Sequence, residues 1–160
     1  MAPHPLPWMK PGDLILFDLE LLPWPAYLRL VEAYFGVRYT ALEPLHSHAN
    51  RAEFLLHQAG EPEALLHCMQ RRHPVALGDL TGLVAEMAST GLRRGFLFSP
   101  GTIDSAVYLR AGDANVELYS GNKLRVRIDS LRADQRRQVM DAISARPQRL
   151  ADGGVETIPR

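Results

Sequence analysis

The amino-acid sequence predicts an α/β domain in which a mixed central sheet carries helices on both of its faces. Three observations lead to this prediction. Residues 95–120 read as an apolar strand, a short helix and a second strand, which favours a parallel pair joined by a right-handed crossover. Two earlier apolar runs, residues 53–57 and 64–68, are spaced like the arms of a β-hairpin. Segments with the periodicity of amphipathic helices flank these strands along the chain.

The N-terminal part of the chain predicts an extended arm followed by a helix. Residues 1–11 hold four prolines, and we expect a loose arm there. The apolar run 14–22 leaves a strand and a short helix open, because its periodicity favours neither. Proline suits the first helical turn, so Pro23 and Pro25 predict a helix start, and Gly36 is its predicted end. The buried stripe of this helix comprises Tyr27, Leu30, Val31, Tyr34 and Phe35.

The middle of the chain predicts strands and one further helix. Residues 39–45 are typical of a short strand. The loop of the following hairpin contains Gly60 and Pro62, and we expect it to be longer than the tightest turns. Residues 79–90 predict an amphipathic helix that Gly91 ends, because glycine readily adopts the left-handed conformation of a helix cap.

The C-terminal part predicts a cap, a strand and a last helix. Thr102 is the predicted cap of the short helix that precedes the strand at residues 116–119. Apolar residues 124, 126 and 128 alternate with arginines, which predicts another strand. Residues 132–146 predict a final helix, and we expect residues 147–160 to be a frayed tail.

Composition and charge bound the possible functions only broadly. With 160 residues and a formal net charge of zero, the chain has room for one core and shows no overall preference for nucleic acid. Over residues 121–150 bases outnumber acids by eight to three, which indicates either a basic face or a solvated charged helix. The single cysteine, Cys68, excludes an intrachain disulfide and favours a reducing compartment. The sequence shows neither a secretory signal nor a long apolar span, so we expect a cytoplasmic location and no membrane partner.

Four segments carry a resemblance to a known family. They are W-x-x-Y-x-x-L-V from Trp24, A-E-M-A-S-T-G-L-x-x-G from Ala85, G-F-L-F-S-x-G from Gly95 and V-E-L-Y-S-G-x-x-L from Val116. In this order and spacing they resemble motifs of the Mrr-like (type IV) restriction endonucleases, a branch of the PD-(D/E)XK nuclease superfamily. The resemblance implies a restriction-endonuclease-like core at residues 24–128, between an N-terminal arm at 1–23 and a C-terminal helix and tail at 129–160.

The resemblance also implies where catalytic residues would lie. The family places an Asp on one strand and Gln-x-Lys or Glu-x-Lys on the next, so that acids hold a divalent cation and the lysine stabilises charge. These positions fall on Glu53, His67 and Met69, and an acid that some members carry in the first helix falls on Leu28. A thioether carries no charge, so Met69 cannot replace the lysine. The resemblance therefore implies a degenerate catalytic motif that needs no cofactor.

An active site of unusual constitution is the alternative. It would use Glu53 and His67 as ligands of Mg²⁺ or Mn²⁺, and zinc also accepts imidazole and carboxylate together. Arg71 shares the strand parity of Met69 and would supply positive charge. The opposing interpretation is that Glu53 and His67 are leftover polar residues on a sheet face.

Arginine pairs are the candidate contacts to DNA. Arg71, Arg72, Arg93 and Arg94 flank the central elements and are placed to touch phosphates. Because the chain has only two lysines, general use of arginine as the surface cation is the alternative explanation. Three hypotheses remain open: a degenerate module that binds DNA or a protein, an active metal-dependent DNA endonuclease, and a module that binds only a protein partner. A homodimer is compatible with each.

Overall fold

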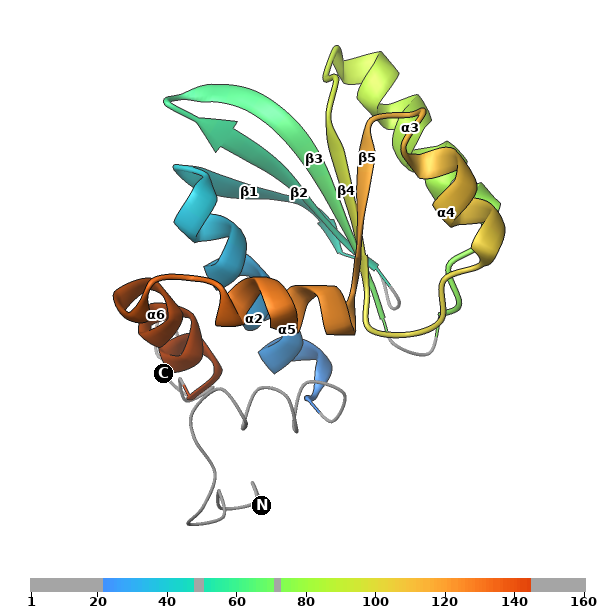
Figure 1. Ribbon diagram of the computed structural model, residues 1–160. Helices are drawn as coiled ribbons and strands as arrows, with labels where there is room; N and C mark the ends of the chain where they lie inside the picture. Colours follow the sequence, from blue (N-terminus) through green and yellow to red (C-terminus); the bar gives the residue numbers. More distant parts are fainter. Residues whose placement is uncertain (1–21, 48–50, 71–72, 145–160) are drawn as a thin grey trace, which may run out of the picture.

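The computed structural model describes residues 22–47, 51–70 and 73–144. Figure 1 shows a twisted five-stranded sheet with helices on both faces, as predicted. The strands are β1 (Ala41–Ser47), β2 (Arg51–Gln58), β3 (Glu61–Met69), β4 (Gly95–Ser99) and β5 (Val116–Ser120). The helices are α2 (Trp24–Arg38), α3 (Leu77–Thr90), α4 (Ser105–Ala111), α5 (Gly121–Asp129) and α6 (Ala133–Ser144).

The sheet is mixed, with the strands in the order β1-β2-β3-β4-β5. β1, β2 and β3 are antiparallel neighbours, whereas β3, β4 and β5 run parallel. The predicted hairpin and the predicted strand-helix-strand unit, which is β4-α4-β5, are therefore both confirmed. This order leaves β1 and β5 at the two edges of the sheet within the described part of the chain.

The hairpin turn is tighter than the sequence predicted. β2 ends at Gln58 and β3 begins at Glu61, so the loop contains only Ala59 and Gly60. Both residues have positive φ, 54° and 86°, as in the type I′ turns that match the twist of paired strands. Pro62 is not a loop residue as expected but lies within β3. The tight turn pairs Gln58 with Glu61 and His57 with Pro62. An irregularity between Leu56 and His57 then shifts the register by one residue, which places Glu53 opposite His67.

Two hydrophobic cores lie on opposite faces of the sheet. On one face, Phe96, Phe98 and Tyr119 pack with Phe35 of α2 and with buried residues of α5 and α6. The other face packs against α3 and α4, with a core whose buried members are Leu65, Met69, Val75, Leu80, Leu83, Met87, Leu97, Val107, Ala111, Val116 and Leu118. Alternate residues of each strand enter alternate cores, because successive side chains point to opposite faces.

The segment after β5 is a helix, and the predicted strand is wrong. Leu124 and Ile128 are fully buried, whereas Val126 is 47% exposed. Burial at i and i+4 but not i+2 is the pattern of a helix face. The side chain of Ser120 accepts a hydrogen bond from Lys123 N, which satisfies one of the first free amides of α5.

Two other predicted boundaries shift. Gly36 does not end α2, which continues to Arg38 and stops where Tyr39 adopts an extended backbone. α4 begins later than expected, with Asp104 instead of Thr102 at its N-cap. The Thr102 carbonyl instead accepts from Val75 N, beside an isolated parallel bridge between Val75 and Ile103. The expected cap at Gly91 is confirmed, with φ of 75°.

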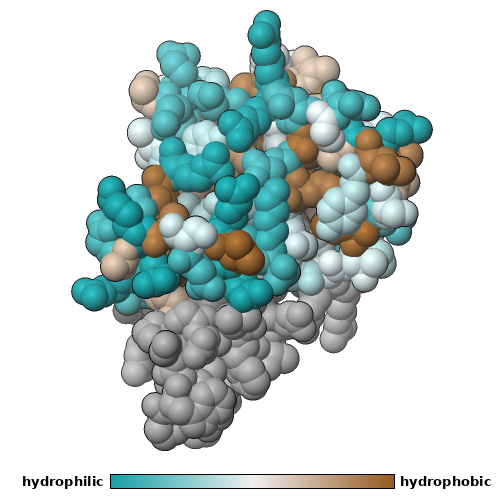
Figure 2. Space-filling view, in the orientation of Figure 1, coloured by the Kyte–Doolittle hydropathy of each residue, from teal (hydrophilic) through white to brown (hydrophobic). Residues whose placement is uncertain are grey.

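Some predictions fall outside the described residues. These are the loose arm predicted at residues 1–11, the apolar run at 14–22 apart from its last residue, and the tail predicted at 147–160. In the described part of the chain, no helix is both long and apolar enough to cross a bilayer. Large hydrophobic side chains are exposed at Tyr108 and Leu109 of α4 and at Val126 of α5. Figure 2 shows hydrophobic residues at the surface on the side where Figure 1 places α3 and α4.

Candidate metal-binding site

Glu53 of β2 and His67 of β3 face each other directly across the hairpin. They are register partners, and both are only 3% exposed. Their strand parity is that of Leu65 and Met69, so they lie on the face of the sheet that α3 covers. Glu53 Oε2 and His67 Nε2 are 3.8 Å apart. The structure thus brings together two of the sequence-predicted ligands.

A third ligand comes from α3 and was missed by the sequence analysis. Glu86 Oε1 lies 3.1 Å from His67 Nε2, in hydrogen-bond contact. One ligand atom from each of Glu53, His67 and Glu86 lies within 4.8 Å of the other two. The available signal was helical spacing, because Glu86 follows the buried Leu83 by three residues and precedes Met87 by one. Periodicity alone does not show which strand residues lie beneath the part of α3 that carries Glu86.

The imidazole of His67 is favoured in its neutral form. Burial lowers the pKa of His67, because an imidazolium ion loses its hydration there. The negative charges of Glu53 and Glu86 act in the opposite direction and raise this pKa, whereas the positive charge of the nearby Arg51 lowers it. The net direction is downward. A neutral imidazole has a ring nitrogen with a free lone pair, which is the form that binds a metal.

Arg51 adds a positive charge at the edge of this cluster. Its Nε lies 2.7 Å from Glu53 Oε2 and forms an ion pair. Its N–H does not point at this oxygen, so the contact is electrostatic and not an aligned hydrogen bond. Arg51 is also the register partner of Met69, the residue at which the sequence resemblance expects a lysine. The guanidinium therefore approaches the cluster from directly across the strand pair.

The donor set suits a divalent cation of borderline softness. Two carboxylates and one imidazole are ligands that Mn²⁺ and Zn²⁺ accept together, whereas Mg²⁺ favours an all-oxygen shell. The side chain of Glu86 is 27% exposed, so the cluster is open to solvent on the α3 side. With Arg51 counted, two carboxylates face one fixed positive charge, and a cation would be attracted to the remaining negative charge.

The other predicted site residues lie elsewhere. Met69 is on the cluster's face but only 1% exposed, within the α3 core. Leu28 packs against the core on the opposite face of the sheet, so the structure does not bring it to Glu53. Cys68 also faces that side, and burial raises the pKa of its thiol well above the ordinary range. Arg71 and Arg72 lie outside the described residues.

Comparison with known proteins gives structural likenesses alone. No protein-family model matches the chain, and no curated protein matches it. The structure is similar to the DNA modification-dependent restriction endonuclease AspBHI, with a TM-score of 0.47 and 13% identity over 90% of this chain and 44% of that one. It is also similar to the MspJI restriction endonuclease in complex with a 27-mer oligonucleotide, with a TM-score of 0.44 and 12% identity over 89% of this chain and 34% of that one.

The chain thus spans less than half the length of either of these enzymes. At such identities and TM-scores the likeness describes the path of the chain, and it assigns no residue of this protein a role. The site must therefore be judged on its own geometry.

Proposed function

We propose that this chain is a restriction-endonuclease-like domain that acts on DNA with a divalent cation held by Glu53, His67 and Glu86. The observation that carries the proposal is the convergence of these three ligands within 4.8 Å. Two of them stand at the positions that the family resemblance gives to the catalytic Asp and to the acid or amide of the next strand. The third, Glu86, is an additional ligand from the covering helix α3, where the resemblance places no ligand.

Each residue has a chemical role in this proposal. A bound divalent cation would polarise a phosphate and lower the pKa of a coordinated water. Glu53 and Glu86 supply carboxylate oxygens and His67 a neutral ring nitrogen. Arg51 offers a guanidinium directly opposite Met69, where it would stabilise negative charge without acting as a base. This arrangement supports hydrolysis despite the absence of lysine at position 69.

Cation binding is the first test. Calorimetric titration of the full chain with Mn²⁺, Zn²⁺ and Mg²⁺ should show binding, with Mn²⁺ or Zn²⁺ preferred over Mg²⁺. Glu86→Gln removes a charged ligand with little change in shape and should weaken Mn²⁺ binding at least about tenfold. Glu63→Gln is the matched control, because Glu63 is exposed on β3, the strand that carries His67. Absence of binding to the unmodified chain at millimolar cation would remove the proposal.

Hydrolysis is the second test. Methylated and unmethylated plasmids should be nicked or cut in Mn²⁺, and Glu53→Gln and Glu86→Gln should each abolish the activity. Arg51→Gln should reduce cleavage more than cation affinity, since Arg51 is proposed to act on the phosphate and not on the cation. Cleavage that survives Glu53→Gln would show that the activity comes from elsewhere.

A catalytically degenerate DNA-binding module is the second candidate. Two observations favour it: Met69 is buried in the core, and the Arg51 guanidinium already neutralises Glu53 at 2.7 Å. On this alternative the cluster is a structural network that holds β2, β3 and α3 together. Cation binding without any nicking of either plasmid would support the degenerate module over the nuclease.

A further inference from the structure

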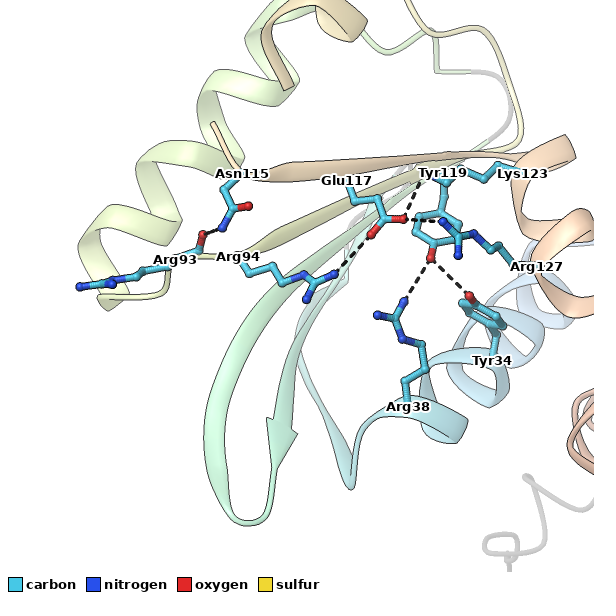
Figure 3. Close-up of polar contacts among 9 residues, drawn as sticks. All are labelled: Tyr34, Arg38, Arg93, Arg94, Asn115, Glu117, Tyr119, Lys123 and Arg127. Carbon is cyan, nitrogen blue, oxygen red and sulfur yellow. Dashed lines mark hydrogen bonds and ion pairs between the residues drawn. The ribbon is translucent and has the colours of Figure 1, made fainter. Parts of the chain in front are cut away.

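A second charged cluster surrounds Glu117 at the β5 edge of the sheet. Figure 3 shows Arg94, which immediately precedes β4, and Lys123 and Arg127 from α5, directed at its carboxylate. The N···O distances are 3.5 Å for Arg94, 3.1 Å for Lys123 and 3.4 Å for Arg127. Arg38, at the end of α2, lies close enough to act on the charge of Glu117. We call these four cations the β5-edge cation cluster.

The β5-edge cation cluster carries more positive charge than Glu117 can neutralise. Four cations act on this one carboxylate, which leaves a surplus of three positive charges among the five groups. Burial raises the pKa of Glu117, but the cations, Lys123 foremost, outweigh it and hold this pKa below its ordinary value. The side chains of Arg94 and Arg127 are 42% and 49% exposed, so their remaining N–H donors reach solvent.

Aromatic rings hold these cations in place. The Lys123 ammonium lies 4.9 Å from the centre of the Tyr119 ring, and the Arg94 guanidinium 5.0 Å from that of Phe96. Arg38 Nη1 donates to the Tyr119 hydroxyl at 3.2 Å. Cations fixed over ring faces lose less conformational freedom when they bind an anion. The cluster is therefore partly organised for a ligand independently of Glu117.

An open cavity of about 310 Å³ adjoins the cluster, between α4 and β5. Lys123 of the cluster and Glu117, which the cluster surrounds, both line this cavity. Tyr108, on the α4 side of the cavity, is 54% exposed. An exposed aromatic ring beside a surplus of cations is the combination that binds single-stranded nucleic acid, since bases stack on the ring and phosphates meet the cations.

We propose that the β5 edge binds single-stranded nucleic acid, with phosphates on Arg94, Lys123 and Arg127 and a base on Tyr108. The Asp and Glu side chains of an acidic peptide would satisfy the cations but offer no flat ring to Tyr108, whereas every nucleotide carries both a phosphate and a base, which favours nucleic acid as the partner. The site lies at the β5 edge, with the Glu117 side chain on the α2 side and Tyr108 on the α4 side. It is separate from the cation-binding cluster because β4 stands between β5 and the strands that carry Glu53 and His67. Nucleic-acid binding at the β5 edge does not depend on the hydrolysis proposed for the cation-binding cluster.

The test measures anisotropy of a fluorescein-labelled oligothymidylate over a salt series in EDTA, so that no divalent cation contributes. Affinity should fall as salt rises, because bound phosphates release counterions. In a plot of log affinity against log salt, the slope should become shallower by about 0.7 for each phosphate contact that a variant removes. Arg94→Gln and Arg127→Gln should each show this change. Arg132→Gln is the matched control, because Arg132 is 73% exposed and pairs with Asp134.

Glu117→Gln distinguishes a binding site from a purely structural network, because the two predict opposite changes in oligothymidylate affinity. Removing the internal anion should strengthen binding of the oligothymidylate, since phosphates no longer compete with a carboxylate for the same donors. A variant that merely loosened the cluster would bind more weakly. Thermal unfolding of each variant shows whether it is folded, so weaker binding by a folded Glu117→Gln chain overturns the proposal.

The proposed base contact is tested separately. Tyr108→Ala should weaken binding on the order of tenfold without changing the salt slope. Leu109→Ala, a neighbour that is 78% exposed, should have little effect. With an abasic strand the Tyr108→Ala effect should disappear. Absence of retention at low salt, or equal binding of poly-glutamate, would overturn the assignment to nucleic acid, and neither outcome bears on cation binding at Glu86.

Discussion

His67 shows how the surroundings of one side chain decide its chemistry. It is 3% exposed and lies against two carboxylates, so burial and charge act on its pKa in opposite directions. Burial has the larger effect, and the pKa is lowered. The unfolded chain therefore binds more protons at this residue than the folded chain, between the lowered value and the ordinary value of 6.5.

This difference predicts how stability depends on pH. The contribution of His67 should be fully present above about 6.5 and should be lost as pH falls through the interval below it. Urea unfolding in EDTA, measured from neutral to mildly acidic pH, should show a decreasing free energy of unfolding. His67→Gln should flatten this decrease. An unchanged slope in the variant would mean that His67 titrates normally in the folded chain.

At the scale of single residues, Arg51 and Met69 also determine how the site is interpreted. Position 69 holds a methionine where the sequence resemblance expects a lysine, and this difference predicts inactivity. The register of the hairpin places a guanidinium directly opposite that position. We proposed that this guanidinium takes the part of the expected lysine, and Arg51→Gln tests that proposal.

At the scale of elements, the helical conformation of α5 contributes both to the core and to the β5-edge cation cluster. As a helix it turns Leu124 and Ile128 into the core and presents Lys123 and Arg127 to Glu117. Lys123 and Arg127 are four residues apart and therefore lie on one helical face. A strand over the same residues would also place 123 and 127 on one face but would bury Val126, which is exposed.

Truncations in α5 test this arrangement. Leu124→Ala should destabilise the protein by about 2–5 kcal/mol, because Leu124 is fully buried and its loss leaves a cavity. Val126→Ala should change the free energy of unfolding by less than about 0.5 kcal/mol, since its side chain faces solvent. Both values come from urea unfolding at neutral pH. Similar losses from the two variants would favour the strand over the helix.

At the scale of the whole molecule, the sheet separates two polar clusters. One lies on β2 and β3 beneath α3, and the other lies at β5 on the side of α2 and α5. Strand β4 stands between them in the sheet. They share no described ion pair, so the free energies of their variants should add.

A double variant tests the separation. Glu86→Gln should lower Mn²⁺ affinity and leave oligothymidylate binding in EDTA unchanged, and Arg127→Gln should do the reverse. In the chain with both substitutions, the loss of Mn²⁺ affinity and the loss of oligothymidylate affinity should each equal the loss in the corresponding single variant, within about 0.5 kcal/mol. A larger discrepancy would mean that the two faces are coupled through the sheet.

The sequence by itself determined the order of elements and most of their types. Alternation and helical spacing are local properties, so the hairpin, the parallel pair and the amphipathic helix before Gly91 could all be predicted. The segment at residues 124–128 was assigned wrongly because three apolar residues at every second position satisfy a strand, whereas the helix leaves Val126 exposed.

The functional arrangement was decided by the tertiary structure. Glu53 and His67 could be proposed from their strands, whereas Glu86 joins them only because α3 docks over β3. The β5-edge cation cluster likewise collects cations from α2, from the residue before β4 and from α5 around one carboxylate. Register and helix docking depend on contacts between residues far apart in the chain, and local periodicity contains no information about which distant side chains will meet.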